Sequence, residues 1–100
     1  MIDLDGKYLQ IVKDILRRHV PECKVLVFGS RVTGTAHKYS DLDLAIVCDE
    51  PIDWRRLESL KDAFSESDLP IMVDVLDWHT LPESFQTIVK NHCEDLQFSK

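Results

Sequence analysis

The segment of residues 29–47, GSRVTGTAHKYSDLDLAIV, contains the pattern on which the fold prediction depends. It places Gly29 and Ser30 directly after a short apolar run, and it places Asp41 and Asp43 at alternate positions where a second apolar run begins. Residues two apart on a strand point to the same face of a sheet. The segment therefore predicts a strand, a glycine turn, and a second strand with two carboxylates on one face.

Apolar periodicity on both sides of this segment predicts three helices and one more strand. Pro21 stops the first helix, Asp53 is a plausible N-cap for the second, and the pattern Thr80-x-x-Glu83 is typical of a capping box that opens the last. The expected elements are a helix over residues 5–20, strands over 24–28 and 41–47, a helix after Asp53, a strand over 71–76, and a helix from Thr80 to Leu96.

The connection between the first two strands indicates how they pair. The 14 residues from Gly29 to Leu42 are too few for a comfortable crossover helix, so the two strands are expected to be antiparallel. The prediction for residues 1–100 is a single α+β domain, in which a small mixed β-sheet has helices packed on it.

Composition and charge exclude several classes of protein. Hydrophobic residues make up 44% of the chain and charged residues 30%, which is typical of a soluble globular protein. The formal net charge of −6 argues against direct nucleic-acid binding, and the pairs Arg17-Arg18 and Arg55-Arg56 are expected on solvated helix faces. No apolar run approaches the roughly 18 residues of a membrane helix, so we expect a cytoplasmic protein without a membrane segment.

The cysteines and histidines are scattered rather than grouped. Cys23, Cys48 and Cys93 are odd in number, widely spaced and without a CxxC pair, so three free thiols are expected rather than a disulfide or a zinc site. His92 is expected to pack on the apolar side of the last helix.

Three aspartates interrupt apolar strands, where an unpaired charge is costly. Asp41 and Asp43 share a face of one expected strand, and Asp74 lies within the next. Carboxylate oxygens are ligands that magnesium prefers. Together the three acids predict a catalytic site for two Mg²⁺ ions, one to activate an attacking hydroxyl and one to neutralise a leaving pyrophosphate.

The glycine turn fits the same chemistry. Gly29 lets the backbone approach a phosphate, the Ser30 hydroxyl can donate to it, and Arg31 or Lys38 would add a charged donor. The candidate nucleotide-binding residues are Gly29, Ser30, Arg31 and Ser40. Each feature alone has a structural explanation as an ordinary turn, a set of surface acids or a paired strand residue. Their combination favours a phosphoryl-transfer site.

The motif formed by GS at Gly29, then Gly34, SDLDLAIV and VDVLDW resembles the DNA polymerase beta nucleotidyltransferase superfamily, in particular its minimal nucleotidyltransferase (MNT) branch. The resemblance implies a palm-like nucleotidyltransferase fold. It also implies that Ser30 contacts a nucleoside triphosphate such as ATP and that Asp41, Asp43 and Asp74 bind the metal ions.

The resemblance further implies a partner. Proteins of this branch are commonly paired as antitoxins with an all-helical HEPN-type toxin, and some attach AMP from ATP to it. We therefore expect a hetero-oligomer with such a partner. One alternative is a non-catalytic antitoxin that neutralises a helical partner by occlusion. Another is transfer to a small molecule such as an aminoglycoside or to an RNA end, which ranks lowest because no additional acceptor domain fits in the chain.

Overall fold

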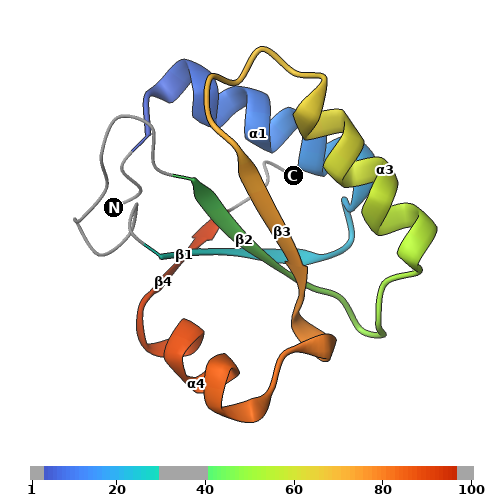
Figure 1. Cartoon of the computed structure of the whole chain (residues 1–100), viewed down its shortest axis with the longest axis vertical. Helices are drawn as coiled ribbons and strands as arrows, with labels where there is room; N and C mark the ends of the chain where they lie inside the picture. The colour runs from blue at the N-terminus through green and yellow to red at the C-terminus, as the bar shows by residue number, and fades with distance from the viewer. Residues whose placement is uncertain (1–3, 30–40, 97–100) are drawn as a thin grey trace.

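The computed structural model describes residues 4–29 and 41–96, and Figure 1 shows how their elements are arranged. In chain order they are α1 (Gly6–His19), β1 (Lys24–Phe28), β2 (Leu42–Val47), α3 (Trp54–Ser65), β3 (Val73–Asp77), the short 3₁₀ helix η1 (Trp78–Thr80), α4 (Glu83–Asn91) and β4 (Cys93–Leu96). This is the expected α+β fold, with one strand more than the sequence predicted.

The strands form a single mixed sheet in the order β3-β2-β1-β4. Strand β1 is antiparallel to both β2 and β4, and β2 is parallel to β3. The expected antiparallel pairing of the first two strands and the mixed character of the sheet are therefore confirmed. The parallel pair allows the chain to return through α3 before it forms β3.

The predicted last helix is wrong in its second half. Helix α4 ends at Asn91, His92 follows as an exposed cap, and Cys93–Leu96 leave the helix to pair with β1 as β4. The strand covers the side of β1 that β2 leaves open, and its backbone bonds to β1 outweigh one further helical turn. His92 therefore does not pack on an apolar helix face.

Local hydrogen bonds set the starts of α1 and α3, and the sequence had predicted the second of these. The Asp5 and Asp53 side chains accept from the Lys7 and Arg55 amides, each at 3.0 Å, so Asp53 is confirmed as an N-cap. The capping box at Thr80 is wrong, because α4 has Pro82 as its N-cap with no side-chain bond. The Thr80 hydroxyl instead donates to the Asp77 carbonyl in η1.

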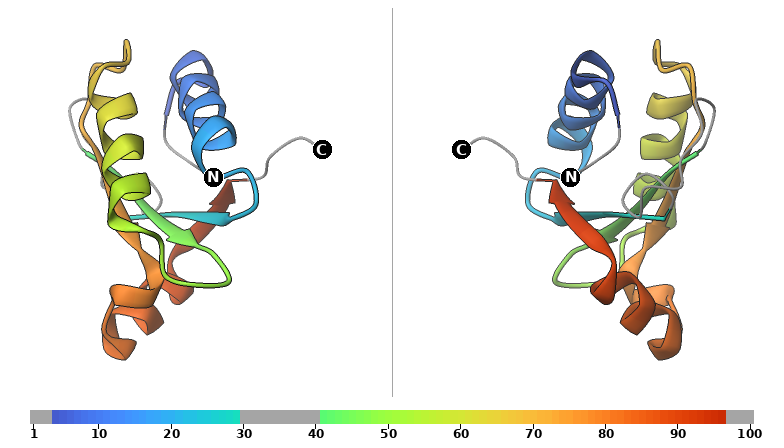
Figure 2. Two further views of the ribbon diagram at one scale, coloured as in Figure 1. Left: turned by 90° about the vertical axis from the view of Figure 1, so that its right-hand side faces the viewer. Right: turned by 90° about the vertical axis from the view of Figure 1, so that its left-hand side faces the viewer.

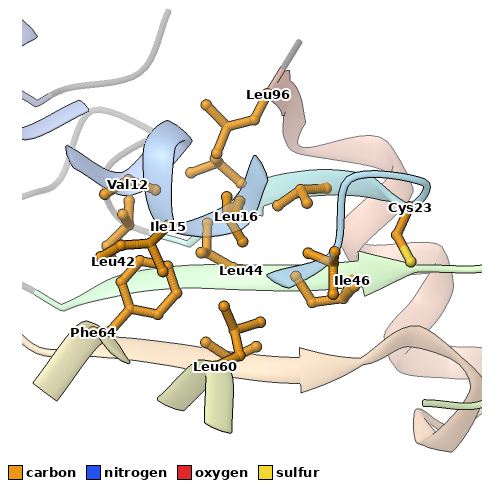
Figure 3. Close-up of a cluster of buried hydrophobic side chains, with 14 residues drawn as sticks. Val12, Ile15, Leu16, Cys23, Leu42, Leu44, Ile46, Leu60, Phe64 and Leu96 are labelled. Carbon is orange, nitrogen blue, oxygen red and sulfur yellow. The ribbon is translucent and has the colours of Figure 1, made fainter. Parts of the chain in front are cut away.

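The two faces of the sheet are covered by different helices. Figure 2 shows α1 and α3 on one side and α4 on the other. On the α1 and α3 side, Leu42, Leu44 and Ile46 of β2 are fully buried, and Figure 3 shows them between the two helices. Burying each such side chain contributes roughly 1.5–3 kcal/mol. The main core therefore holds β2 in register, with its alternate residues directed to the opposite face.

A disulfide joins Cys23 and Cys48 at the ends of β1 and β2, so the prediction of three free thiols is wrong for these two residues. They extend the antiparallel register beyond the pair of Lys24 and Val47, and their Cα atoms lie 4.5 Å apart, the spacing of directly opposed residues. Cys93 has a free thiol. The spacing of cysteines along the chain could not reveal a pair that strand register creates.

The helices of the described residues give no sign of a membrane span. None of them is both long and apolar enough to cross a bilayer.

Candidate active site

The acidic residues meet where β2 and β3 begin. Asp41 directly precedes β2, Asp43 is its second residue, and Asp74 is the second residue of β3. In the parallel register Asp43 lies opposite Asp74. Because Leu42 and Leu44 point into the main core, Asp43 between them points to the face that carries α4, and so does Asp74 opposite it.

Electrostatics shows that the three carboxylates share one region. Asp43 is half-buried, whereas Asp41 and Asp74 are exposed. Burial raises the pKa of Asp43, and the negative charges of Asp74 and Asp41 raise it further. A site that disfavours its own ionised carboxylate in this way is suited to bind a cation.

Gly29 brings the turn after β1 against the same acid. Its φ of +83° is a left-handed conformation that side chains rarely adopt, and a Cβ placed there would collide with Oδ2 of Asp43. Glycine is therefore required at this position for two independent reasons. Its backbone lies beside the carboxylate, as a turn that receives the phosphates of a metal-bound nucleotide would need to do.

Three of the four predicted nucleotide-binding residues lie outside the described residues. These are Ser30, Arg31 and Ser40, and Gly34 and Lys38 lie in the same segment. Their roles remain predictions from the sequence.

The chemistry of the three carboxylates fits a magnesium site. Among residues 4–29 and 41–96, no group of three or more His, Cys, Asp or Glu side chains is arranged to hold a metal. Three hard oxygen donors in one region are nevertheless the ligand type that magnesium takes. Asp41 and Asp74 are exposed, so their side chains have room to turn toward Asp43. The backbone positions therefore fit such a site.

Two supporting features were not predicted. Phe28, which lies opposite Asp43 on β1, packs edge-on against Phe85 of α4 with ring centroids 5.8 Å apart. Asp77 is 3% exposed, and its carboxylate accepts from the amides of Ile52 at 3.0 Å and His79 at 3.1 Å. The first contact fixes α4 beneath the site, and the second anchors the far end of β3. The motif VDVLDW contained Asp77, but the sequence did not distinguish its structural role from that of Asp74.

Comparisons with known proteins bear on the family and the fold of the chain. The model of the family "Polymerase beta, Nucleotidyltransferase" matches residues 10–95. A Haemophilus influenzae protein named "Probable protein adenylyltransferase MntA" is 54% identical over 89 residues, which cover 89% of this chain and 78% of that protein.

Solved structures share the fold at low sequence identity. A crystal structure of a toxin-antitoxin with AMP-PNP superposes with a TM-score of 0.68 at 23% identity, covering 92% of this chain and 74% of the matched chain. A structure of a tri-AMPylated Shewanella oneidensis HEPN toxin in complex with its MNT antitoxin has a TM-score of 0.57 at 20% identity, covering 91% and 73%. At these identities the structures support the fold.

Proposed function

The chain belongs to the polymerase beta nucleotidyltransferase family, and on that basis we propose that it transfers AMP from ATP to a hydroxyl group of a HEPN-type toxin and thereby acts as its antitoxin. The relative that is 54% identical is named as a protein adenylyltransferase. The toxin of one structural relative is tri-AMPylated and bound to an MNT antitoxin. The need for ATP places the proposed reaction in the cytoplasm.

The observation that carries the proposal is the position of Asp43. It is half-buried, it faces Asp74 across a strand pair, and its pKa is raised by burial and by its two acidic neighbours. A carboxylate held in this way is costly as plain structure, and a bound cation would offset that cost. Structural acids such as Asp77 differ, because their oxygens accept backbone hydrogen bonds.

In this proposal Asp41, Asp43 and Asp74 would hold two magnesium ions. Bound magnesium would activate the attacking hydroxyl and neutralise the leaving pyrophosphate. The turn at Gly29, with the predicted donors Ser30 and Arg31, orients the triphosphate.

The proposed transfer exchanges one phosphorus–oxygen bond for another. The acceptor oxygen bonds to the α-phosphorus of ATP, the bond from that phosphorus to the bridging oxygen breaks, and pyrophosphate leaves. In this proposal the exposed carboxylate of Asp74 takes the hydroxyl proton. The product is AMP joined to the acceptor protein by a phosphodiester.

Intact-mass spectrometry of a HEPN-type partner tests the proposal. The partner is incubated with this protein, ATP and magnesium, beside a double variant with Asp41→Asn and Asp43→Asn. Mass increments of whole AMP units that vanish with the variant support transfer. An unmodified partner in the presence of folded wild-type protein that forms a complex with it would contradict the proposal.

A second candidate function is neutralisation by occlusion. Trp54 at the start of α3 is 67% exposed, and large exposed aromatics are enriched at protein interfaces. In that case the double Asn variant would still bind the toxin and block its activity. Loss of neutralisation with binding retained would exclude occlusion and leave transfer as the function.

A further inference from the structure

A groove between α3 and β3 opens next to Asp74. Its volume is about 530 Å³, and it is lined by Lys61, Phe64 and Ser65 of α3 and by residues 69–75, which lead into β3. Apolar side chains form most of this lining. Among the described residues that line the groove, Lys61 and Asp74 carry a charge. The groove is therefore largely apolar, and it includes one of the three proposed catalytic acids.

The groove runs around one edge of the sheet. Strand β3 is an edge strand of the sheet that the described residues form, and α3 packs against it on the core side, as Figures 1 and 2 show. Val75 faces the core beneath α3, whereas Asp74 points to the opposite face beside Asp43. A chain lying in the groove would therefore pass from α3 to the carboxylates.

The strand order indicates which of the two substrates, the nucleotide or the acceptor, lies on the β3 side of the site. Gly29 follows β1, and Asp74 belongs to β3, so the two flank β2 and its Asp43. The attacking and leaving oxygens of a phosphoryl transfer lie roughly in line on opposite sides of the phosphorus. If the triphosphate rests on the turn at Gly29, the attacking hydroxyl enters from the side of β3.

We infer that the groove between α3 and β3 binds the acceptor segment of the protein substrate, an extended stretch of polypeptide that presents its hydroxyl side chain beside Asp74. The inference rests on the proposed function, because it assigns the second substrate of that reaction to a place. Met72 at the mouth of the groove is 74% exposed and provides a flexible apolar contact for such a segment.

The backbone of β3 favours a polypeptide in this position. The amide of Leu42 donates to the carbonyl of Met72 at 3.0 Å, so Met72, and with it Asp74, directs its backbone toward β2. The N–H and C=O groups of successive residues in a strand point to opposite edges. Those of Val73 and Val75 therefore point to the outer edge of the sheet. An extended segment can add to such an edge by main-chain hydrogen bonds.

Charge disfavours a nucleic-acid acceptor in the same groove. Lys61 is the one cation among its described lining residues, and it lies 3.6 Å from Glu58 in an ion pair. A single paired lysine is not the basic stripe that a phosphate backbone needs. The chain's net charge of −6 instead complements a basic polypeptide segment.

Steady-state kinetics of Met72→Asp tests the inference, with Ile88→Asp as the matched control. Ile88 is also a large exposed hydrophobic residue, 58% exposed, but it lies on α4. We expect Met72→Asp to raise the KM for the partner protein about tenfold or more. AMP-PNP binding measured by calorimetry should stay unchanged, and Ile88→Asp should leave both quantities near wild type. An unchanged KM for Met72→Asp would overturn the inference.

A second measurement separates the inference from the proposed function because it needs no catalysis. In a Cys93→Ser background, maleimide labelling of Met72→Cys and Ile88→Cys is timed with and without the partner. Slower labelling at position 72 alone would support the groove as the binding site, even if the wild-type protein transferred no AMP. Equal labelling of Met72→Cys with and without a saturating partner would overturn it.

Discussion

Asp43 and Asp74 lie directly opposite each other on the parallel strands β2 and β3, and the charge of Asp74 helps to raise the pKa of Asp43. A strand pair normally places apolar or oppositely charged side chains at opposed positions, because like charges there are destabilising. Among the strand pairs of the described residues, Asp43 and Asp74 are the opposed pair of like charges. Their position is where the proposed transfer site lies.

Asp43→Asn should stabilise the metal-free protein while it abolishes transfer. A carboxylate whose pKa is raised in the folded state stabilises the fold below its unfolded pKa, and this contribution is lost as pH rises through the folded pKa. The variant should therefore have a higher melting temperature than the wild type at pH 7, by about 4–8 °C for each kcal/mol that the loss of the buried charge and of its repulsion by Asp74 and Asp41 contributes. The difference should disappear in acid, below the unfolded pKa.

Scanning calorimetry from pH 3 to pH 8, in chelator and then in magnesium, checks this prediction. Magnesium should raise the melting temperature of the wild type and have little effect on the variant. A variant that is less stable than the wild type at pH 7 in chelator would contradict the electrostatic explanation.

Gly29→Ala should damage both the site and the fold. The added Cβ meets Asp43 Oδ2, and the backbone must keep a φ of +83°, so a loss of roughly 1–3 kcal/mol is expected together with loss of transfer. Gly6→Ala is the matched control, because a Cβ at Gly6 meets no atom within 4 Å in helix α1. It should be neutral or stabilising by about 0.4–1 kcal/mol in urea unfolding. Equal stability of the two variants would refute the assigned role of Gly29.

Reduction of the disulfide between Cys23 and Cys48 should lower stability without removing the site. The two residues are 25 apart in sequence, and closing a loop of that length stabilises a fold by roughly 2–4 kcal/mol. The bond lies at the opposite end of β2 from Asp43, so the reduced protein should still transfer AMP. Urea unfolding with and without dithiothreitol, with Cys93→Ser as control, measures the difference. Identical midpoints would argue against the bond.

Arg56→Ala should destabilise the fold more than Arg55→Ala. Arg56 Nε donates to the His19 carbonyl at 2.9 Å, and its Nη2 lies 2.6 Å from Glu22, so it joins α3 to the end of α1. The expected cost is about 1 kcal/mol. Arg55 contacts the exposed Trp54 ring, and its loss should be near neutral.

The acid limb of the stability curve gives a further check on Arg56. Its guanidinium holds the pKa of Glu22 below the ordinary value. The ion pair therefore stabilises the fold above the unfolded pKa of Glu22, and this contribution is lost as pH falls through the folded pKa. The difference in the free energy of unfolding between wild type and Arg56→Ala should become smaller in acid. A difference that does not depend on pH would exclude the ion pair as its cause.

Local patterns predicted most of the fold because neighbouring residues decide it. Alternation along β2, the N-cap at Asp53 and the short connection after β1 each needed only a few consecutive residues. Strand β4 was missed because four residues are too few to show a period, and their pairing depends on β1, which lies far away in sequence. The disulfide was missed for the same reason, since register brings Cys23 and Cys48 together.

In the candidate site, too, neighbouring residues could be interpreted from the sequence, whereas contacts between distant residues could not. The spacing of Asp41 and Asp43 predicted that they share a strand face, although Asp41 lies one residue before β2. The place of Asp74 beside Asp43 depends on the register between two strands separated by a helix. The sequence showed only that Asp74 was a charge in an apolar strand. The role of the Ser30 hydroxyl as a hydrogen-bond donor to a phosphate stays a prediction.

The rate of AMP transfer by Asp74→Asn tests the central claim most directly. Labelled ATP, magnesium and a HEPN-type partner are supplied to the wild type, to this variant and to Asp62→Asn, which removes an exposed acid on α3. The account predicts a loss of about 100-fold or more for Asp74→Asn, with fold and partner binding intact, and a normal rate for Asp62→Asn. Transfer by Asp74→Asn at the wild-type rate would contradict the three-carboxylate site.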